Sequence, residues 1–176
     1  ILSDIYSVMK KPLLITIIIL ILVLALPFIN FLRWSFQSKR PIDIVILDKT
    51  VPTLERLNHK SLTWILNNER FVKKDKKRSY SYKKDYYEFA PTRPLKDRGN
   101  IKKEYHLSEM IDLPEKTDAL YFADTYGVFF NDWYVGVNKS RRSRKIYGGL
   151  NNTDYLLINE MMNRNKLIIL EYNSFD

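Results

Sequence analysis

Ile42-Asp43-Ile44-Val45-Ile46-Leu47 is the stretch that decides the fold expected for this chain. The run is short, rich in β-branched residues and ended by the polar sequence Asp48-Lys49-Thr50, a pattern typical of a buried β-strand. Residues 118–123 and 166–170 form two more apolar runs of this kind. Because all three runs are continuous rather than alternating, we expect a parallel sheet that is covered on both faces.

Helical patterns separate these strands. Pro52 and Thr53 can open a helix. Its expected apolar stripe consists of Leu54, Leu57, Leu62, Ile65 and Leu66. Asn152 or Thr153 can cap a second helix over residues 154–163. The expected apolar face of that helix consists of Tyr155, Leu156, Ile158, Met161 and Met162. Strands that alternate with helices predict βαβ units, and therefore an α/β domain of Rossmann-like or flavodoxin-like type.

Two long polar stretches interrupt this pattern. Residues 73–104 are rich in Lys and Tyr, and we expect a long excursion there after a short strand at residues 71–72. A short helix is predicted at residues 107–111. Residues 131–149 are expected to form another polar loop.

The residues before the domain predict a membrane anchor. Residues 13–32 form a 20-residue run without a charged side chain, and a helix of that length spans about 30 Å, the thickness of a bilayer core. Basic residues bracket the run, and no A-x-A-like signal cleavage site follows it. The expected organisation is a tail at 1–11, a transmembrane helix at 12–32, a juxtamembrane linker at 33–41 and the α/β domain at 42–176.

The orientation and the ends of the chain lead to two further expectations. The basic residues on the two flanks nearly balance, and a short tail before a single span and a long domain favours an extracytoplasmic domain. The chain begins at Ile1 and stops just after an apolar, strand-like run, so we expect a domain that is incomplete at the C-terminus.

Composition excludes several kinds of chemistry. The chain has no Cys, which excludes disulfides, thiolate metal sites and a Cys nucleophile. Its two histidines, His59 and His106, have no partner at metal-ligand spacing, and we interpret them as surface or structural residues. The net charge of +9 is concentrated in two stretches, the Lys- and Tyr-rich residues 73–87 and the basic residues 141–145, and either can be a solvated loop face. Beside a membrane anchor, the first stretch favours anionic lipid headgroups as a partner over nucleic acid.

Polar side chains follow each of the three predicted strands. Ligands of open parallel sheets bind at the carboxyl ends of the strands, where this chain places Asp48, Asp124 and Glu171. These three carboxylates could hold Mg²⁺ through oxygen ligands or serve as an acid/base pair. The residues expected to hold an anionic ligand are Lys49, Thr50, Thr125, Arg141 and Arg142. The alternative is that Asp48 and Asp124 cap turns and pair with Lys49.

Asp48-Lys49-Thr50 also resembles the phosphorylation motif of P-type ATPases and of the haloacid dehalogenase superfamily. In those families the motif continues into Gly-Thr, whereas Val51 and Pro52 follow here. A second Asp pair for the metal is not identifiable in the chain.

A broader resemblance is to the class I glutamine amidotransferase-like fold. The strand ending Ile-Leu-Asp-Lys-Thr, the stretch Leu-Tyr-Phe-Ala-Asp-Thr-Tyr-Gly-Val at 120–128, the segment Ile-Tyr-Gly-Gly-Leu at 146–150 and the strand Leu-Ile-Ile-Leu-Glu-Tyr-Asn at 167–173 carry it. Together they resemble membrane-anchored bacterial proteins of unassigned function with such a domain. True amidotransferases use a Cys on a tight strand-to-helix elbow, and this chain has neither Cys nor a Gly-x-Ser-x-Gly elbow. The resemblance therefore implies a non-catalytic or repurposed domain.

Two functions remain open at this stage. The first is a non-catalytic accessory or scaffolding subunit of a membrane or cell-envelope assembly, with other envelope proteins as partners through Tyr-rich loops. The second is an envelope enzyme for a phosphorylated or sugar-like substrate, with Asp48, Asp124 and Glu171 as its reactive carboxylates. The enzyme hypothesis requires those three carboxylates to surround one cleft.

Overall fold

The computed structural model describes residues 2–75, 77–91, 100–103, 108, 112–134 and 143–174. The chain divides into two compact units, Ile1–Ser38 and Lys39–Asp176, which we describe separately.

The first unit is one long helix. Helix α1 (Leu2–Phe36) contains Pro12 and Pro27, and its span from Pro12 to Phe36 is apolar on every side. By length and composition this span is sufficient to cross a membrane, and none of it is buried. The helix expected from the apolar run is therefore confirmed.

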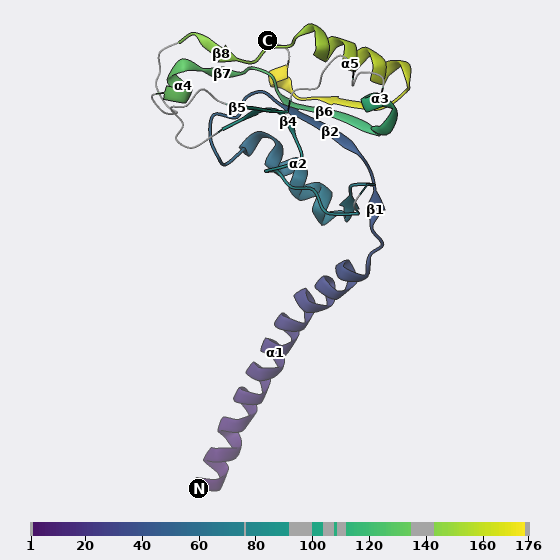
Figure 1. Cartoon of the computed structure of the whole chain (residues 1–176). Coiled ribbons are helices and arrows are strands. Elements are labelled where there is room, and N and C mark those ends of the chain that lie inside the picture. Colours follow the sequence, from purple (N-terminus) through teal and green to yellow (C-terminus); the bar gives the residue numbers. More distant parts are fainter. Residues whose placement is uncertain are drawn as a thin grey trace. The chain divides into compact units, whose positions relative to one another are not determined.

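The second unit is built on a mixed five-stranded sheet with the order β5-β4-β2-β6-β9 (Figure 1). Its strands are β2 (Ile44–Asp48), β4 (Tyr87–Ala90), β5 (Asn100–Lys103), β6 (Ala119–Asp124) and β9 (Leu167–Leu170). Strands β4, β2, β6 and β9 are parallel, and β5 runs antiparallel to β4. An α/β domain with a largely parallel sheet is thus confirmed, with one antiparallel strand that we did not predict.

Helices cover the two faces of this sheet. Helix α2 (Leu57–Asn68) lies on one face, and α3 (Asp112–Lys116) and α5 (Asn152–Asn163) lie on the other (Figure 1). The core on the α2 side includes Ile46, Leu66, Tyr80, Tyr86, Phe89, Tyr121 and Trp133. The core on the α5 side is formed by Val45, Leu47, Leu120, Phe122, Leu157 and Met161. Successive residues of β2 and β6 alternate between the two cores, because side chains alternate along a strand.

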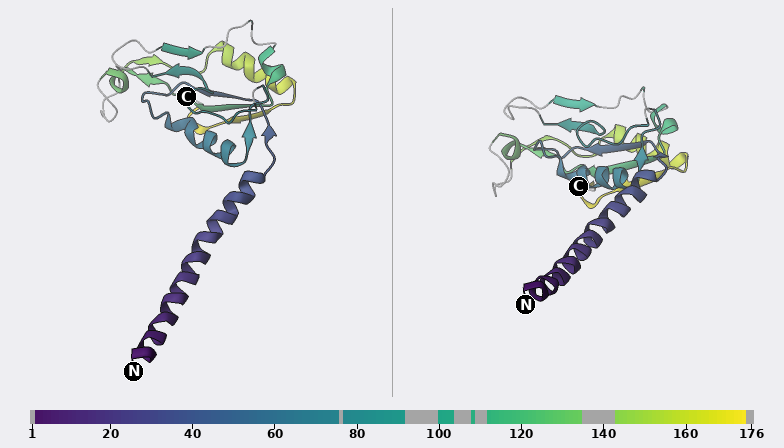
Figure 2. Two further views of the ribbon diagram at one scale, coloured as in Figure 1. Left: turned by 60° about the horizontal axis from the view of Figure 1, so that its bottom comes forward. Right: turned by 90° about the horizontal axis from the view of Figure 1, so that it is seen from below.

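Smaller elements complete the unit. Strand β1 (Arg40–Pro41) pairs in parallel with β3 (Phe71–Val72). Strands β7 (Val128–Phe129) and β8 (Lys145–Tyr147) pair antiparallel, and α4 (Phe130–Tyr134) follows β7 directly. In both views of Figure 2 this β7–α4–β8 group lies at the end of the sheet away from α3. A 3-10 turn, η2 (Tyr172–Ser174), follows β9.

Several sequence-based expectations about the elements were wrong. The excursion after residue 73 contains β4, which pairs with β2, and β5. The loop expected at 131–149 contains the rest of α4 and strand β8. The N-cap of α5 is Asn151, one residue before the first expected position. The helix expected at 107–111 stays a prediction, because of these residues the structure describes only Ser108.

The outer strand β9 also departs from the expectation that both faces of the sheet are covered. Its burial alternates: Ile168 and Leu170 pack into the α5-side core, while the side chains of Leu167 and Ile169 are 59% and 41% exposed. Within the part of the chain that the structure describes, β9 is the last strand of the sheet. One face and one backbone edge of β9 therefore stay uncovered there.

Candidate functional site

The candidate site lies where the chain reverses its direction across the sheet. From β2 the chain continues to β4 on one side, and from β6 it continues to β9 on the other side. Ligands of open α/β sheets bind at the carboxyl ends of the strands beside such a switch point. We call the carboxyl ends of the four parallel strands β4, β2, β6 and β9 together the carboxyl edge. It carries an acidic residue on every parallel strand or directly after it: Glu88, Asp48, Asp124 and Glu171.

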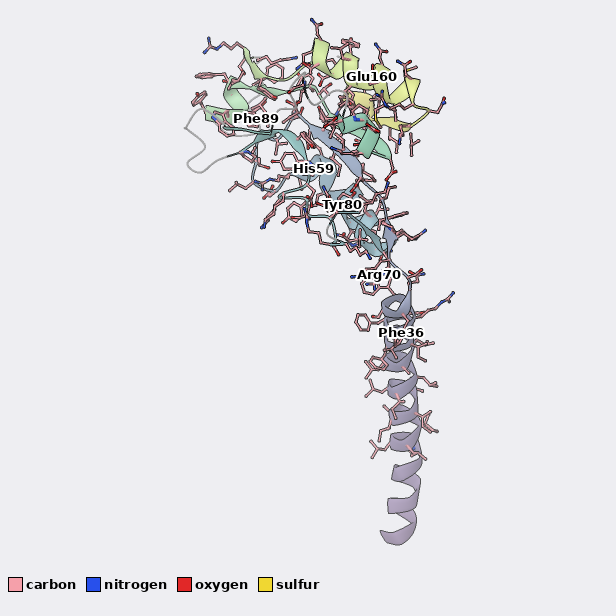
Figure 3. All side chains as sticks on the ribbon, turned by 45° about the vertical axis from the view of Figure 1, so that its right-hand side comes forward. Phe36, His59, Arg70, Tyr80, Phe89 and Glu160 are labelled. Carbon is pink, nitrogen blue, oxygen red and sulfur yellow. The ribbon has the colours of Figure 1, made fainter. Side chains whose placement is uncertain are left out.

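Asp48 forms a buried pair with His59. The end of β2 and the first turn of α2 position the two side chains, and both are fully buried. Asp48 Oδ2 lies 2.5 Å from His59 Nδ1, while His59 Nε2 lies 2.8 Å from the carbonyl oxygen of Tyr82. The imidazole stacks on Tyr86, and Figure 3 shows it between α2 and the sheet. Burial raises the pKa of the Asp48 carboxyl, and the hydrogen bond and charge of His59 only partly offset that effect.

Asp124 accepts hydrogen bonds from a different set of donors. Thr50 Oγ1 donates to Asp124 Oδ1 at 2.6 Å, and the same hydroxyl accepts from the backbone N–H of Gly127. The backbone N–H of Tyr126 also donates to Oδ1, closing a turn of the kind that aspartate favours. Asn173 Nδ2 donates to Oδ2 at 3.2 Å. Asp124 therefore joins the ends of β2, β6 and η2.

Lys49 is a buried cation with its own counterion. Its Nζ lies 2.5 Å from Asp154 Oδ2 and donates to the carbonyl oxygen of Gly149 at 3.1 Å. Both charged side chains are almost completely buried. Asp154 also accepts from the backbone N–H of Asn151 in the capping box of α5. The pair thus fastens the start of α5 to the end of β2.

The remaining two carboxylates of the edge accept from tyrosines. Glu88 on β4 is buried, has a φ of +85° and accepts a hydrogen bond from the Tyr147 hydroxyl of β8. Glu171 is exposed and accepts from the Tyr121 hydroxyl. Burial and this glutamate raise the pKa of Tyr121. A positive φ at a residue other than glycine is a strained conformation that often accompanies a functional site.

Two glycines bring the β7–β8 pair against the edge. Gly127 and Gly148 both have positive φ values, +106° and +119°. A Cβ atom on Gly148 would lie 2.2 Å from the Cα of Gly127, so the two backbones approach as closely as only glycine allows. This contact holds the Tyr147 loop beside Glu88.

The predicted site residues meet at one edge but form separate pairs. Asp48 and Asp124 are partners in the β2–β6 register, yet their carboxyl groups and that of Glu171 each accept from different donors. Thr125 is buried and acts through its backbone, whose carbonyl accepts from Gly149 N–H. Arg141 and Arg142 lie outside the described residues. Among the described side chains, no group of three His, Asp or Glu residues is arranged to hold a metal ion.

Sequence reasoning missed four residues of this edge: His59, Asp154, Glu88 and Tyr147. The spacing of Asn151 and Asp154 is that of a capping box, so the position of Asp154 at the helix start could have been found. Nothing in the sequence indicated that His59 faces Asp48 or that Tyr147 faces Glu88, because these contacts depend on how the elements pack.

The Lys- and Tyr-rich segment is more strongly paired than its composition suggested. Arg78 donates two hydrogen bonds to Asp85, at 2.6 and 2.5 Å, and Lys74 pairs with Asp118 at 2.6 Å. Burial alone would raise the pKa of Asp85, but the hydrogen bonds from Arg78 and Ser81 lower it below its usual value. Tyr80 is buried, and its hydroxyl donates to the carbonyl oxygen of Ile42 and accepts from the backbone N–H of Ile44, which fixes the segment against the start of β2. Burial raises the pKa of Tyr80 to about 12.

A groove of about 180 Å³ lies at the opposite end of the sheet from the candidate site. Strands β2 and β4, the residues after β3, and α3 line it, and its charged lining residues are Asp43, Lys73, Asp75 and Lys116. None of the predicted site residues contributes to this groove.

The chain matches none of the protein-family models, curated proteins or solved structures with which we compared it.

Proposed function

We propose that this protein is a membrane-anchored, non-catalytic accessory or scaffolding subunit of a membrane or cell-envelope assembly. The observation that carries the proposal is the division of roles in the α/β unit. At the carboxyl edge, ionisable groups are largely buried and paired with one another, as in Lys49–Asp154 and Asp48–His59. Large apolar side chains are instead exposed on the outer strand β9. Buried pairs of this kind hold the elements of the unit together, whereas exposed apolar side chains favour protein contact.

The topology supports a flavodoxin-like domain as the scaffold. Numbered by their order along the chain, the parallel strands β2, β4, β6 and β9 have the spatial order 2-1-3-4. This is the beginning of the flavodoxin-like order, with helices on both faces. It is compatible with the amidotransferase-like resemblance, and a domain of that type without Cys would bind rather than hydrolyse.

The apolar helix α1 supports a membrane anchor. We propose that it spans the bilayer once, with the α/β unit on the extracytoplasmic side, and that membrane lipids and neighbouring membrane proteins are its partners. The edge of β9 that faces away from β6 has no strand beside it among the described residues, and such an edge suits partners that add a strand to the sheet. Tyr172, which is 92% exposed at the start of η2, is an aromatic side chain of the kind common at interfaces.

Purification of the full chain in mild detergent tests this proposal. We expect one or more chains to co-purify at constant stoichiometry from the native membrane. Ile169→Lys on β9 should release them, because it places a charge on the exposed apolar strand, while the charge-matched control Asn68→Lys at the end of α2 should retain them. A wild-type chain that purifies alone would contradict the proposal.

The enzyme hypothesis keeps one observation in its favour. Glu88 is buried at the carboxyl edge in a strained backbone conformation, beside Asp48 in the β2–β4 register. If the edge acts on a phosphorylated or sugar-like substrate with Mg²⁺, calorimetry should detect Mg²⁺ binding by the wild-type chain. Asp48→Asn and Asp124→Asn should abolish that binding. Unchanged heats in both variants would exclude these carboxylates as ligands.

A further inference from the structure

Helix α2 has an exposed side that the sequence pattern did not predict. Leu57 and Ile65, which the pattern placed in the core, are 62% and 49% exposed, and Trp64 is 67% exposed. The buried side of the helix consists of His59, Thr63 and Leu66. In Figure 1, α2 forms the layer on the face of the sheet opposite α5. Three large apolar side chains of α2 therefore face away from the core.

The same side of α2 is basic. Lys60 is exposed and lies one helical turn from both Leu57 and Trp64. The helix contains no Asp or Glu. The ammonium groups of Lys60 and Lys83 lie 5.5 and 5.6 Å from the centre of the Tyr82 ring, so the Lys- and Tyr-rich segment extends the basic surface beside the helix. We call these five residues the α2 surface.

We propose that the α2 surface docks on the anionic headgroups of a lipid bilayer. This inference rests on the proposed membrane anchor. Residues 37–39 alone separate the end of α1 from β1, and such a linker spans at most about 14 Å, which keeps the bilayer within reach of the α/β unit. Strand β1 is in turn fastened to the end of α2, because Arg40 donates to the backbone carbonyl and the side chain of Glu69. The linker thus joins the α/β unit beside the helix that carries the α2 surface.

The chemistry of the α2 surface matches a bilayer interface. Tryptophan is enriched where headgroups meet acyl chains, because its ring is apolar and its N–H is polar. Lysines beside such a ring add an attraction to anionic lipids, which salt screens. The net charge of +9 favours an anionic partner and disfavours a second copy of the chain.

A fluorescent label on α2 tests docking in the full chain, since the natural chain contains no Cys to compete for the label. Ser61→Cys places an NBD group on the exposed side of α2. The labelled chain is reconstituted into vesicles of phosphatidylcholine and phosphatidylglycerol that include lipids with a nitroxide at the headgroup. We expect the nitroxide to quench the label, because docking brings α2 to the headgroups. An unquenched label would overturn the proposal.

The matched control Asn159→Cys carries the same label on α5, on the opposite face of the sheet. That side of α5 also exposes apolar side chains that the pattern placed in the core: Tyr155, Leu156 and Met162. The charged residues at its margin, Glu160 and Arg164, pair with each other; Glu160 is labelled in Figure 3. We expect this label to stay unquenched, because the side lacks the basic residues of the α2 surface. Equal quenching of the two labels would overturn the proposal.

Lipid charge and lysine substitutions test the anionic partner. Vesicles of phosphatidylcholine alone, or high salt, should strongly reduce the quenching of the Ser61→Cys label. Lys60→Gln and Lys83→Gln should each lower the ratio of docked to free chains about fivefold, whereas the control Lys116→Gln on α3 should leave it unchanged. Circular dichroism should be the same for all variants, since these lysines are exposed. Quenching that is independent of lipid charge and of both lysines would overturn the proposal and assign the surface to another partner.

Flotation of the vesicles separates this inference from the proposed anchor. A chain that does not float with the vesicles would contradict the anchor and this inference together. A chain that floats, but whose Ser61→Cys label is not quenched, would overturn docking by the α2 surface and leave the anchor in place.

Discussion

Burial and hydrogen bonding place two aspartates of the α/β unit in opposite electrostatic states. Asp48 lies in the interior, where loss of hydration raises its pKa above the usual value. Asp85 is partly buried too, but the two hydrogen bonds from Arg78 and one from Ser81 favour its ionised form and lower its pKa. The two residues should therefore contribute to stability with opposite dependence on pH.

Asp48→Asn should leave the fold intact. The wild type should lose stability as the pH rises, and the variant should not. His59 Nε2 faces the carbonyl oxygen of Tyr82, so this nitrogen carries a proton and donates it. The contact between Asp48 Oδ2 and His59 Nδ1 requires a second proton between these two atoms. An asparagine supplies that hydrogen and still accepts from Thr50 N–H and Asn58, so we expect a change within about 1 kcal/mol near pH 4.

The direction of this pH dependence follows from the raised pKa of Asp48. The stability that protonated Asp48 contributes is complete below pH 3.8, the carboxyl's ordinary pKa, and is lost as pH rises through the higher folded pKa. Urea unfolding of the full chain in mild detergent can be followed by the fluorescence of buried Trp133. The free energy of unfolding of the variant, relative to that of the wild type, should increase from pH 4 upward. A parallel pH profile for the two proteins would contradict this. Asp48→Ala, which leaves His59 Nδ1 buried without its partner, should cost about 1–3 kcal/mol more than Asp48→Asn.

Asp85→Asn should show the reverse profile. Because the folded pKa is lowered, the stabilisation by Asp85 is present above pH 3.8 and is lost as pH falls through the folded pKa. We expect a loss of about 1–2 kcal/mol at pH 7, moderated by the partial exposure of Arg78, and convergence with the wild type once the pH falls below the lowered pKa of Asp85. Asp112→Asn, which removes an exposed ion pair with Lys116, is the control and should change stability by less than about 0.5 kcal/mol.

At the scale of elements, the position of the β7–β8 pair depends on a contact between two glycines. Gly148→Ala should cost about 3 kcal/mol or more, because the new Cβ would lie 2.2 Å from the Cα of Gly127. Gly149→Ala is the matched control. It also has a positive φ, but its Cβ would meet only the flexible end of Lys145 at 3.8 Å, so we expect a loss of about 1–2 kcal/mol from backbone strain alone. Urea unfolding measures both losses, and equal values would show that the close approach does not matter.

Elements with continuous apolar runs could be predicted from the sequence, whereas those defined by their neighbours could not. Strands β2 and β6 lie within one residue of the end expected from Leu47 and Ala123, because a buried parallel strand must be apolar throughout. Strand β4 contains Glu88 between Tyr87 and Phe89, and its pairing with β2 and β5 and the hydrogen bond from the Tyr147 hydroxyl to Glu88 make that sequence a strand. In α5 the apolar residues nearly surround the helix, so periodicity did not decide which side faces the sheet.

At the scale of the whole molecule, the edge that carries the candidate site could be predicted, but its pairing could not. Three polar strand ends in a parallel sheet must meet at one edge, and Asp48 and Asp124 do so. Which donor each carboxylate receives depends on segments far away in the sequence, such as Asp154 for Lys49 and Asn173 for Asp124. No local sequence pattern indicates which distant segment supplies the partner of each residue.

The division of the chain into two units predicts that the α/β unit folds without α1. Both cores lie entirely within Lys39–Asp176, so a chain that begins at Lys39 should show the same circular dichroism for its sheet and the same urea midpoint. The full chain should remain in membranes after carbonate extraction, whereas the shortened chain should be released, because only α1 offers an apolar span among the described residues. The full-length double variant Leu20→Arg/Leu24→Arg is the control. Its two charges near the centre of the span cost about 5–7 kcal/mol for insertion, so they should release the chain from the membrane while the α/β unit stays folded. A shortened chain that stays in the membrane would place the anchor in the α/β unit, and one that fails to fold would show that the two units depend on each other.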